Sequence, residues 1–137
     1  MLKVAVIDAN AISRDLLKSV LINGGYYIAG DSNLTPAGIA SMIKLRPQMI
    51  CIDVGQANEE GMAKIDMLRT QLPKTLIFLV SGEFDSATVQ IALQHGVHGF
   101  IVKPFNPNTV MTTIRNTVIK VAKQHRRAAV GDEEGST

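Results

Sequence analysis

The sequence predicts an α/β fold built on a doubly wound parallel sheet, and three observations lead to it. Five short apolar runs alternate with five segments whose apolar residues recur at helical spacing. Strands that alternate with helices form parallel sheets, because each right-handed crossover returns the chain to the same end of the sheet. The chain of 137 residues is 46% apolar and 19% charged, which is the balance of one globular domain with a real core.

Three strands and two helices are expected in the first half of the chain. Apolar runs predict strands at residues 3–7, 26–29 and 49–52. Apolar residues recur at helical spacing over 12–21, and the two glycines at 24–25 end that helix. A threonine–proline pair at 35–36 supplies an N-cap and a first helical residue, so a second helix begins there and ends at the arginine–proline pair 46–47.

The second half continues the alternation with two strands and three helices. The strands are expected at residues 76–80 and 100–102. The helical stripe at 62–72 ends before a proline, and a shorter stripe at 89–93 ends before a glycine. An asparagine–proline pair at 106–107 begins the last helix, whose core face runs from Val110 to Val121.

The end of the chain differs in composition, so we expect a folded domain at residues 1–124 and a flexible tail at 125–137. The tail is basic at 125–127 and acidic at 132–134, with glycines around the acids. The cations near the end of the last helix are Lys120, Lys123, Arg126 and Arg127. We interpret them as a solvated helix end, where positive charge suits the helix dipole.

Composition excludes several classes of function. The net charge of +2 is too small to predict nucleic-acid binding. No apolar stretch approaches the roughly 20 residues of a membrane helix, and the start of the chain does not have the pattern of a signal peptide. Cys51 lies inside an apolar run and is the only cysteine, so a reducing compartment is the simplest interpretation. We therefore expect a cytoplasmic protein that contacts neither nucleic acid nor membrane directly.

Four polar residues come directly after four of the predicted strands. They are Asp8, Asp53, Ser81 and Lys103. Because the carboxyl ends of parallel strands lie at one edge of the sheet, these side chains can converge. Carboxylate oxygens suit Mg²⁺, a carboxylate can act as a nucleophile toward phosphorus, and a lysine with a hydroxyl can bind the phosphoryl oxygens. The sequence therefore predicts a site for a phosphoryl group and a divalent cation.

Several motifs around these residues occur in a characteristic order. They are VIDAN at 6–10, Asp53 with Gly61 eight residues later, SG at 81–82 and FIVKPF at 100–105. With these motifs the chain resembles a receiver domain of a two-component response regulator, of the chemotaxis-regulator type, over residues 3–123. The resemblance implies a flavodoxin-like (βα)5 sheet of strand order 2-1-3-4-5, with the site at the switch between the first and third strands.

The resemblance also implies a role for each site residue. Asp53 is expected to be the phosphoacceptor, taking the phosphoryl group from a histidine kinase or a phosphotransfer protein. Asp8, Asp53 and the main-chain carbonyl of Gly55 are expected to bind Mg²⁺. Ser81 and Lys103 are expected to contact the phosphoryl group.

Two further features of the resemblance concern the switch and its output. Ser81 and Phe100 are expected to be switch residues, although plain core packing is an equal interpretation of Phe100. The Lys103–Pro104 bond is expected to be cis. The resemblance implies that a downstream protein, or a second copy in a homodimer, binds the face of the fourth helix, fifth strand and fifth helix.

Two positions depart from the family pattern. Ala9 stands where the family has a second acid, and alanine offers no oxygen to a metal, so weakened Mg²⁺ binding is expected. The loop after Asp53 also lacks the usual proline, with Gln56 and Ala57 in that region. An alternative interpretation is therefore a degenerate receiver that acts as a phosphorylation-independent interaction module.

A remote alternative is a phosphatase of the haloacid dehalogenase type, with Asp8 as its nucleophile. Such an enzyme also has a strand-terminal serine and a later lysine, which Ser81 and Lys103 would supply. This interpretation leaves Asp53 unused and places Asn10 where a second acid is expected. A dinucleotide-binding fold is excluded, since no G-x-G-x-x-G follows the first strand. The favoured prediction is a phosphoacceptor rather than an enzyme.

Overall fold

Five parallel strands form one sheet in the order β2-β1-β3-β4-β5. The computed structural model describes the backbone of residues 2–135 and the side chains of residues 2–128. The strands are β1 (Lys3–Ile7), β2 (Tyr27–Ser32), β3 (Met49–Ile52), β4 (Leu76–Ser81) and β5 (Gly99–Val102). The helices are α1 (Ala11–Asn23), α2 (Pro36–Lys44), α3 (Glu59–Gln71), α4 (Ser86–Gln94) and α5 (Pro107–Gly135). The order confirms the flavodoxin-like fold expected from the sequence.

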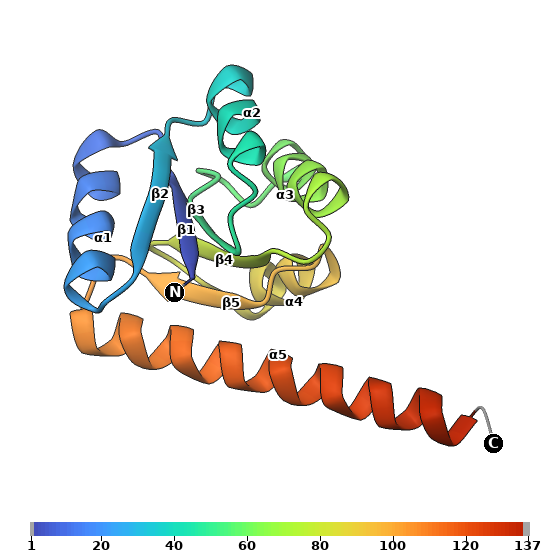
Figure 1. The fold of residues 1–137 in the computed structure, drawn as a ribbon. Helices are drawn as coiled ribbons and strands as arrows, with labels where there is room; N and C mark the ends of the chain where they lie inside the picture. Colours follow the sequence, from blue (N-terminus) through green and yellow to red (C-terminus); the bar gives the residue numbers. More distant parts are fainter. Residues whose placement is uncertain (1, 136–137) are drawn as a thin grey trace.

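Two hydrophobic clusters cover the two faces of the sheet, because alternate strand residues point to opposite sides. On one face Val6, Cys51 and Phe78 pack with α1 and α5. On the other face Ile7 and Ile52 pack with α2, α3 and α4 (Figure 1). The central strands are buried on both sides, which explains their continuous apolar runs.

Two elements differ from the sequence-based expectation. Strand β2 continues to Ser32, where we expected it to end at residue 29, because Gly30, Asp31 and Ser32 pair with β1 beyond a register shift. Helix α5 continues through Gly135, where we expected a flexible tail from residue 125. Lysine, arginine, glutamine and alanine favour helix there, and no glycine or proline interrupts the chain between Pro107 and Gly131. The helix therefore does not end at the expected domain boundary, and the division into domain and tail stays a prediction.

A guanidinium group ties together the amino-terminal edge of the sheet, opposite the strand ends that carry the polar residues. The guanidinium of Arg69 donates to the carbonyls of Pro73, Thr75 and Gly96 at 2.9, 3.0 and 3.0 Å. Nδ1 of His98 accepts the Ile77 backbone N–H at 3.0 Å and lies 3.3 Å from Arg69. The imidazole is therefore an acceptor at Nδ1 and neutral in this arrangement.

This arrangement predicts that folding stability falls in mild acid. Burial is the main cause that lowers the pKa of His98, and the charges of Arg69 and His125 lower it further. In the unfolded chain His98 titrates near its ordinary value of about 6.5, so the unfolded chain binds more protons below that pH. We expect the free energy of unfolding, measured with urea, to decrease between about pH 7 and pH 5. The decrease should be smaller in His98→Gln. An equal decrease in that variant would contradict the assignment of this pH dependence to His98.

No helix among the described residues is long and apolar enough to cross a membrane.

Candidate functional site

The ammonium group of Lys103 lies between two carboxylates at the carboxyl edge of the sheet. Its Nζ is 2.9 Å from Oδ2 of Asp8 and 2.7 Å from Oδ2 of Asp53. Asp8 follows β1, Asp53 follows β3 and Lys103 follows β5, so three strand ends supply the three groups. Asp8 is only 6% exposed, and all three lie where water has limited access. The parallel sheet thus brings together side chains up to 95 residues apart in the sequence.

The remaining oxygens of the two carboxylates are held by backbone N–H groups. Oδ1 of Asp8 accepts the Asn10 N–H, and Oδ1 of Asp53 accepts the Gly55 N–H, both at 2.8 Å. Gly55 has a φ of 81°, a conformation that glycine adopts without strain. Arg14 of α1 donates from Nη1 to the main-chain carbonyl of Asp8 at 2.6 Å. Both carboxylates are therefore fixed in orientation.

The surroundings of Lys103 keep its ammonium charged. Burial lowers the pKa of this group, but hydrogen bonds and Coulombic attraction from Asp53 and Asp8 outweigh burial, so the pKa is raised above its ordinary value. Two carboxylates and one ammonium leave the cluster with one net negative charge. An ammonium fixed in this way can stabilise negative charge that develops on a group attached to Asp53.

The hydroxyl of Ser81 belongs to a local turn. Its Oγ donates to the Glu83 carbonyl at 3.0 Å and accepts the Glu83 N–H at 3.2 Å. The Ser81 carbonyl accepts the Lys103 backbone N–H at 2.9 Å, but its hydroxyl makes no hydrogen bond to Asp8, Asp53 or Lys103 among the described residues. A cavity of about 220 Å³ separates the loop after β3 from the loop after β4, and Ser81 lines it. The other lining residues are Val54, Gly55, Gln56, Ala57, Leu79, Val80, Glu83 and Thr88.

An aromatic pair lies beside the turn that holds Ser81. The rings of Phe84 and Phe100 meet edge to face, with centroids 5.1 Å apart and an interplanar angle of 73°. Phe100 is half-buried and packs against the core on the face of α2, α3 and α4. The peptide bond between Lys103 and Pro104 is cis, as expected. The described geometry is compatible with either interpretation of Phe100.

The fit of this site to Mg²⁺ is partial. Asp8 and Asp53 offer carboxylate oxygens, which suit the ion, but Ala9 offers none. The described residues contain no group of three or more acidic, histidine or cysteine side chains that could hold a metal ion. The Lys103 ammonium already contacts both carboxylates. These residues fit an ion that keeps several waters and shares its carboxylates with Lys103.

The side chains of three of the four predicted strand-end residues meet, whereas the Ser81 hydroxyl makes no hydrogen bond to them. Asn10 has a role that we did not expect from the sequence: its side chain caps α1 and its N–H holds Asp8. An asparagine three residues before Ser13 was an available capping signal. Arg14 could not be predicted as a site residue, because a contact to a main-chain carbonyl leaves no pattern in the sequence.

Comparisons with known proteins agree with this geometry. The family model described as "Response regulator receiver domain" matches residues 4–115. The chain is 27% identical to the chemotaxis protein CheY of Thermotoga maritima over 112 residues, which are 82% of this chain and 93% of that protein. It is 26% identical to the transcriptional regulatory protein AruR of Pseudomonas aeruginosa, and this match covers 94% of the chain but only 53% of AruR.

Solved structures give the same result. Vibrio cholerae CheY4 is 26% identical and superposes with a TM-score of 0.72, covering 85% of this chain and 98% of that one. The receiver domain of a modulated diguanylate cyclase from Desulfovibrio desulfuricans has a TM-score of 0.75 at 18% identity, with 90% and 98% covered, and shows the shared fold. The chain belongs to the family of response regulator receiver domains, of the chemotaxis-regulator type, which act in two-component phosphorelay signalling.

Proposed function

We propose that Asp53 accepts a phosphoryl group from a phosphohistidine, and that its phosphorylation switches the binding of a partner protein. The observation that carries this proposal is the Lys103 ammonium, which lies 2.7 Å from Asp53 and 2.9 Å from Asp8. Asp53 has a backbone donor on one oxygen and a cation on the other. This environment suits a carboxylate that must remain ionised and oriented toward an incoming phosphorus atom.

The proposed transfer exchanges one bond for another. A carboxylate oxygen of Asp53 forms a bond to phosphorus while the bond from phosphorus to the donor's imidazole nitrogen breaks, and the bonding pair stays on that nitrogen. Lys103 stabilises the negative charge on the phosphoryl oxygens during this step. Ser81 would contact the new phosphoryl oxygens after leaving its turn with Glu83, and Phe100 would respond to that movement.

Receiver domains generally bind Mg²⁺ at their acidic pocket. Here Asp8, Asp53 and the Gly55 carbonyl would hold the ion, and weakly, because Ala9 supplies no ligand. When bound, the ion would neutralise charge on the phosphoryl oxygens.

Restoring the second acid should strengthen the cation site. We expect Ala9→Asp to bind Mg²⁺ more tightly by about 10-fold or more, since ligand charge is a main determinant of affinity for such hard cations. Isothermal titration with MgCl₂ measures the change, with Asn10→Asp as a control that adds an acid one position later. Equal affinity in Ala9→Asp and the unmodified chain would contradict this account of the missing acid.

Receiver domains are generally phosphoacceptors rather than enzymes. In the proposed reaction Asp53 is consumed once per phosphorylation, so activity beyond self-phosphorylation and self-dephosphorylation is not required. The phosphodonor must approach the edge of the sheet that carries Asp53. Ile12 and Leu16 of α1 are 73% and 55% exposed next to that edge, and they offer an apolar surface to a histidine kinase or a phosphotransfer protein.

The output surface is proposed to include α4, β5 and α5. Ile91 and Leu93 of α4 and Val102 of β5 are exposed apolar residues, which suits a downstream protein or a homodimer. Phe84 follows the Ser81 turn and its ring meets that of Phe100 in β5, so a rearrangement of this pair would connect phosphorylation to this surface. A cytoplasmic location accords with a phosphohistidine donor.

Incubation with a small-molecule phosphodonor and Mg²⁺, followed by intact mass spectrometry, tests the proposal. One phosphoryl group should be gained by the unmodified chain and none by Asp53→Ala. No gain at any Mg²⁺ concentration would instead favour a degenerate interaction module. Turnover of a phosphate ester that survives Asp53→Ala but is lost in Asp8→Ala would favour the phosphatase.

A further inference from the structure

The positive charge of the chain is concentrated on α5. Residues 2–106 contain nine Lys or Arg and nine Asp or Glu, so they are neutral overall. Residues 107–128 of α5 contain five Lys or Arg and no acid. The net charge of +2 averages this segment with the acids at 132–134 and conceals the separation. The five cations are Arg115, Lys120, Lys123, Arg126 and Arg127.

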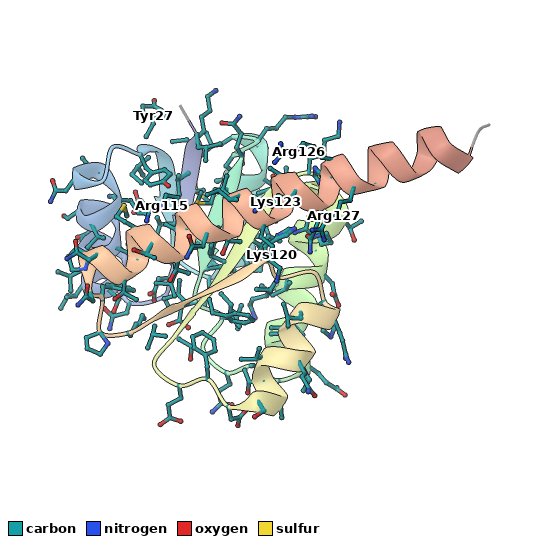
Figure 2. The ribbon with its side chains drawn as sticks, turned by 90° about the horizontal axis from the view of Figure 1, so that it is seen from below. Tyr27, Arg115, Lys120, Lys123, Arg126 and Arg127 are labelled. Carbon is teal, nitrogen blue, oxygen red and sulfur yellow. The ribbon has the colours of Figure 1, made fainter. Side chains whose placement is uncertain are left out.

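These cations are exposed and carry no counter-charge from the described part of the molecule. Figure 2 looks onto α5 and shows all five distributed along the helix. None of them takes part in an ion pair or a side-chain hydrogen bond with another described residue, and residues 107–128 contain no acid that could offset their charge. The helix dipole does not account for them, because its effect is confined to the last turn and α5 continues to Gly135. Five cations along residues 107–128, with no acid among them, favour an external anion as partner.

One side of the helix presents a stripe of six side chains, five of which are hydrogen-bond donors. A shallow groove of about 360 Å³ runs along α5, lined by Asn116, Ile119, Lys120, Lys123, Gln124 and Arg127. This spacing of three and four residues places all six side chains on one face of the helix. From Asn116 to Arg127 the stripe is about 17 Å long. It contains two amides, three cations and the exposed side chain of Ile119, but no carboxylate.

We propose that this stripe of α5 binds duplex DNA through the phosphate backbone. The apolar side of α5 faces away from solvent, since Val110 and Ile114 are buried against the sheet, so α5 has no wide apolar face to insert into a membrane. Helix α5 lies at the surface of the molecule (Figure 1), and an exposed helix fits the major groove.

The chemistry of the stripe also matches a nucleic acid. Lys120, Lys123 and Arg127 would contact phosphates, which carry a dense and regular negative charge. Asn116 and Gln124 can donate to phosphates or meet base edges. Tyr27 of β2, which is 53% exposed, lies on the same side of the molecule in Figure 2 and adds a further hydrogen-bonding group. The expectation of no direct nucleic-acid contact rested on the net charge, which does not reveal this local concentration.

Fluorescence anisotropy with a labelled DNA duplex of random sequence tests the proposal on the full chain. Binding should weaken with salt, with a slope of log K against log [salt] of about −3 for three or four phosphate contacts. In the double variant Lys120→Gln/Lys123→Gln the slope should become shallower by about 2, and affinity at low salt should fall by about 10-fold or more. Lys44→Gln/Lys64→Gln removes the same charge from α2 and α3 and should leave the slope unchanged.

Two further measurements distinguish duplex binding from pairing between copies and from binding to a membrane. Neutralising the distal acids in Asp132→Asn/Glu133→Gln/Glu134→Gln should tighten duplex binding, because these acids repel phosphate. Weaker binding in that variant, with loss of self-association in sedimentation, would overturn the proposal in favour of pairing between copies. The proposal is also overturned by equal losses in the two lysine pairs, by no duplex binding at low salt, or by tighter binding to vesicles that contain phosphatidylserine. Circular dichroism checks that α5 is intact in each variant.

Discussion

Phosphorylation of Asp53 should slow by at least about 100-fold when Lys103 is replaced by methionine. The ammonium is the one cation in contact with Asp53 among the described residues, and methionine retains much of its length without the charge. Loss of a fixed donor to a developing oxyanion typically costs two to three orders of magnitude. The measurement is the initial rate of phosphoryl gain from a small-molecule phosphodonor, followed by intact mass at a fixed Mg²⁺ concentration.

Lys18→Met is the matched control for this experiment. Lys18 also lies in an ion pair on the same molecule, with Asp31, but contacts neither Asp8 nor Asp53. Its replacement should leave the rate unchanged, while Lys103→Arg should restore part of the rate because the charge returns with a different shape. An unchanged rate in Lys103→Met, with a folded protein, would remove Lys103 from the proposed mechanism.

Replacing Arg69 by methionine should lower the free energy of unfolding by about 3 kcal/mol. The guanidinium is the partner of three main-chain carbonyls, at Pro73, Thr75 and Gly96, and methionine leaves them without a donor. Burial lowers the pKa of Arg69, and the carbonyls replace the hydration that Nη1 and Nη2 lose. Denaturant unfolding measures the change.

The control for Arg69 is Lys64→Met on the same helix. Lys64 makes no side-chain hydrogen bond or ion pair among the described residues, so its loss should change the unfolding free energy by less than about 0.5 kcal/mol. Arg69 lies at the opposite end of the sheet from Asp53, so phosphorylation of a folded Arg69→Met should proceed at the normal rate. Equal stability in the two variants would show that the carbonyls are satisfied by water instead.

The alternation of strands and helices could be predicted from the sequence, because buried parallel strands are apolar runs that lie between segments with helical spacing of apolar residues. The strand order came from the family resemblance. The predicted end of β2 and the predicted length of α5 were wrong for separate reasons. Gly30, Asp31 and Ser32 have low strand propensity and are held by pairing with β1, while the residues after 125 favour helix despite their mixed charge.

The candidate site was predictable where topology alone decides position. Asp8, Asp53 and Lys103 follow strands, and the carboxyl ends of parallel strands must share an edge. Ser81 also ends a strand, but its hydroxyl is hydrogen-bonded to the backbone of Glu83. The position of a residue at a strand end does not determine such a local hydrogen bond. The cations of α5 do not lie at the end of the helix as we expected, because α5 continues to Gly135.

The most direct test locates the phosphoryl group on the chain. After incubation with a phosphodonor, reduction with borohydride converts a phosphorylated aspartate to homoserine, and peptide mass spectrometry identifies the residue. We predict that homoserine appears at position 53 alone, in the peptide that contains Cys51 and Asp53. Homoserine at position 8, or none at any aspartate, would contradict the account.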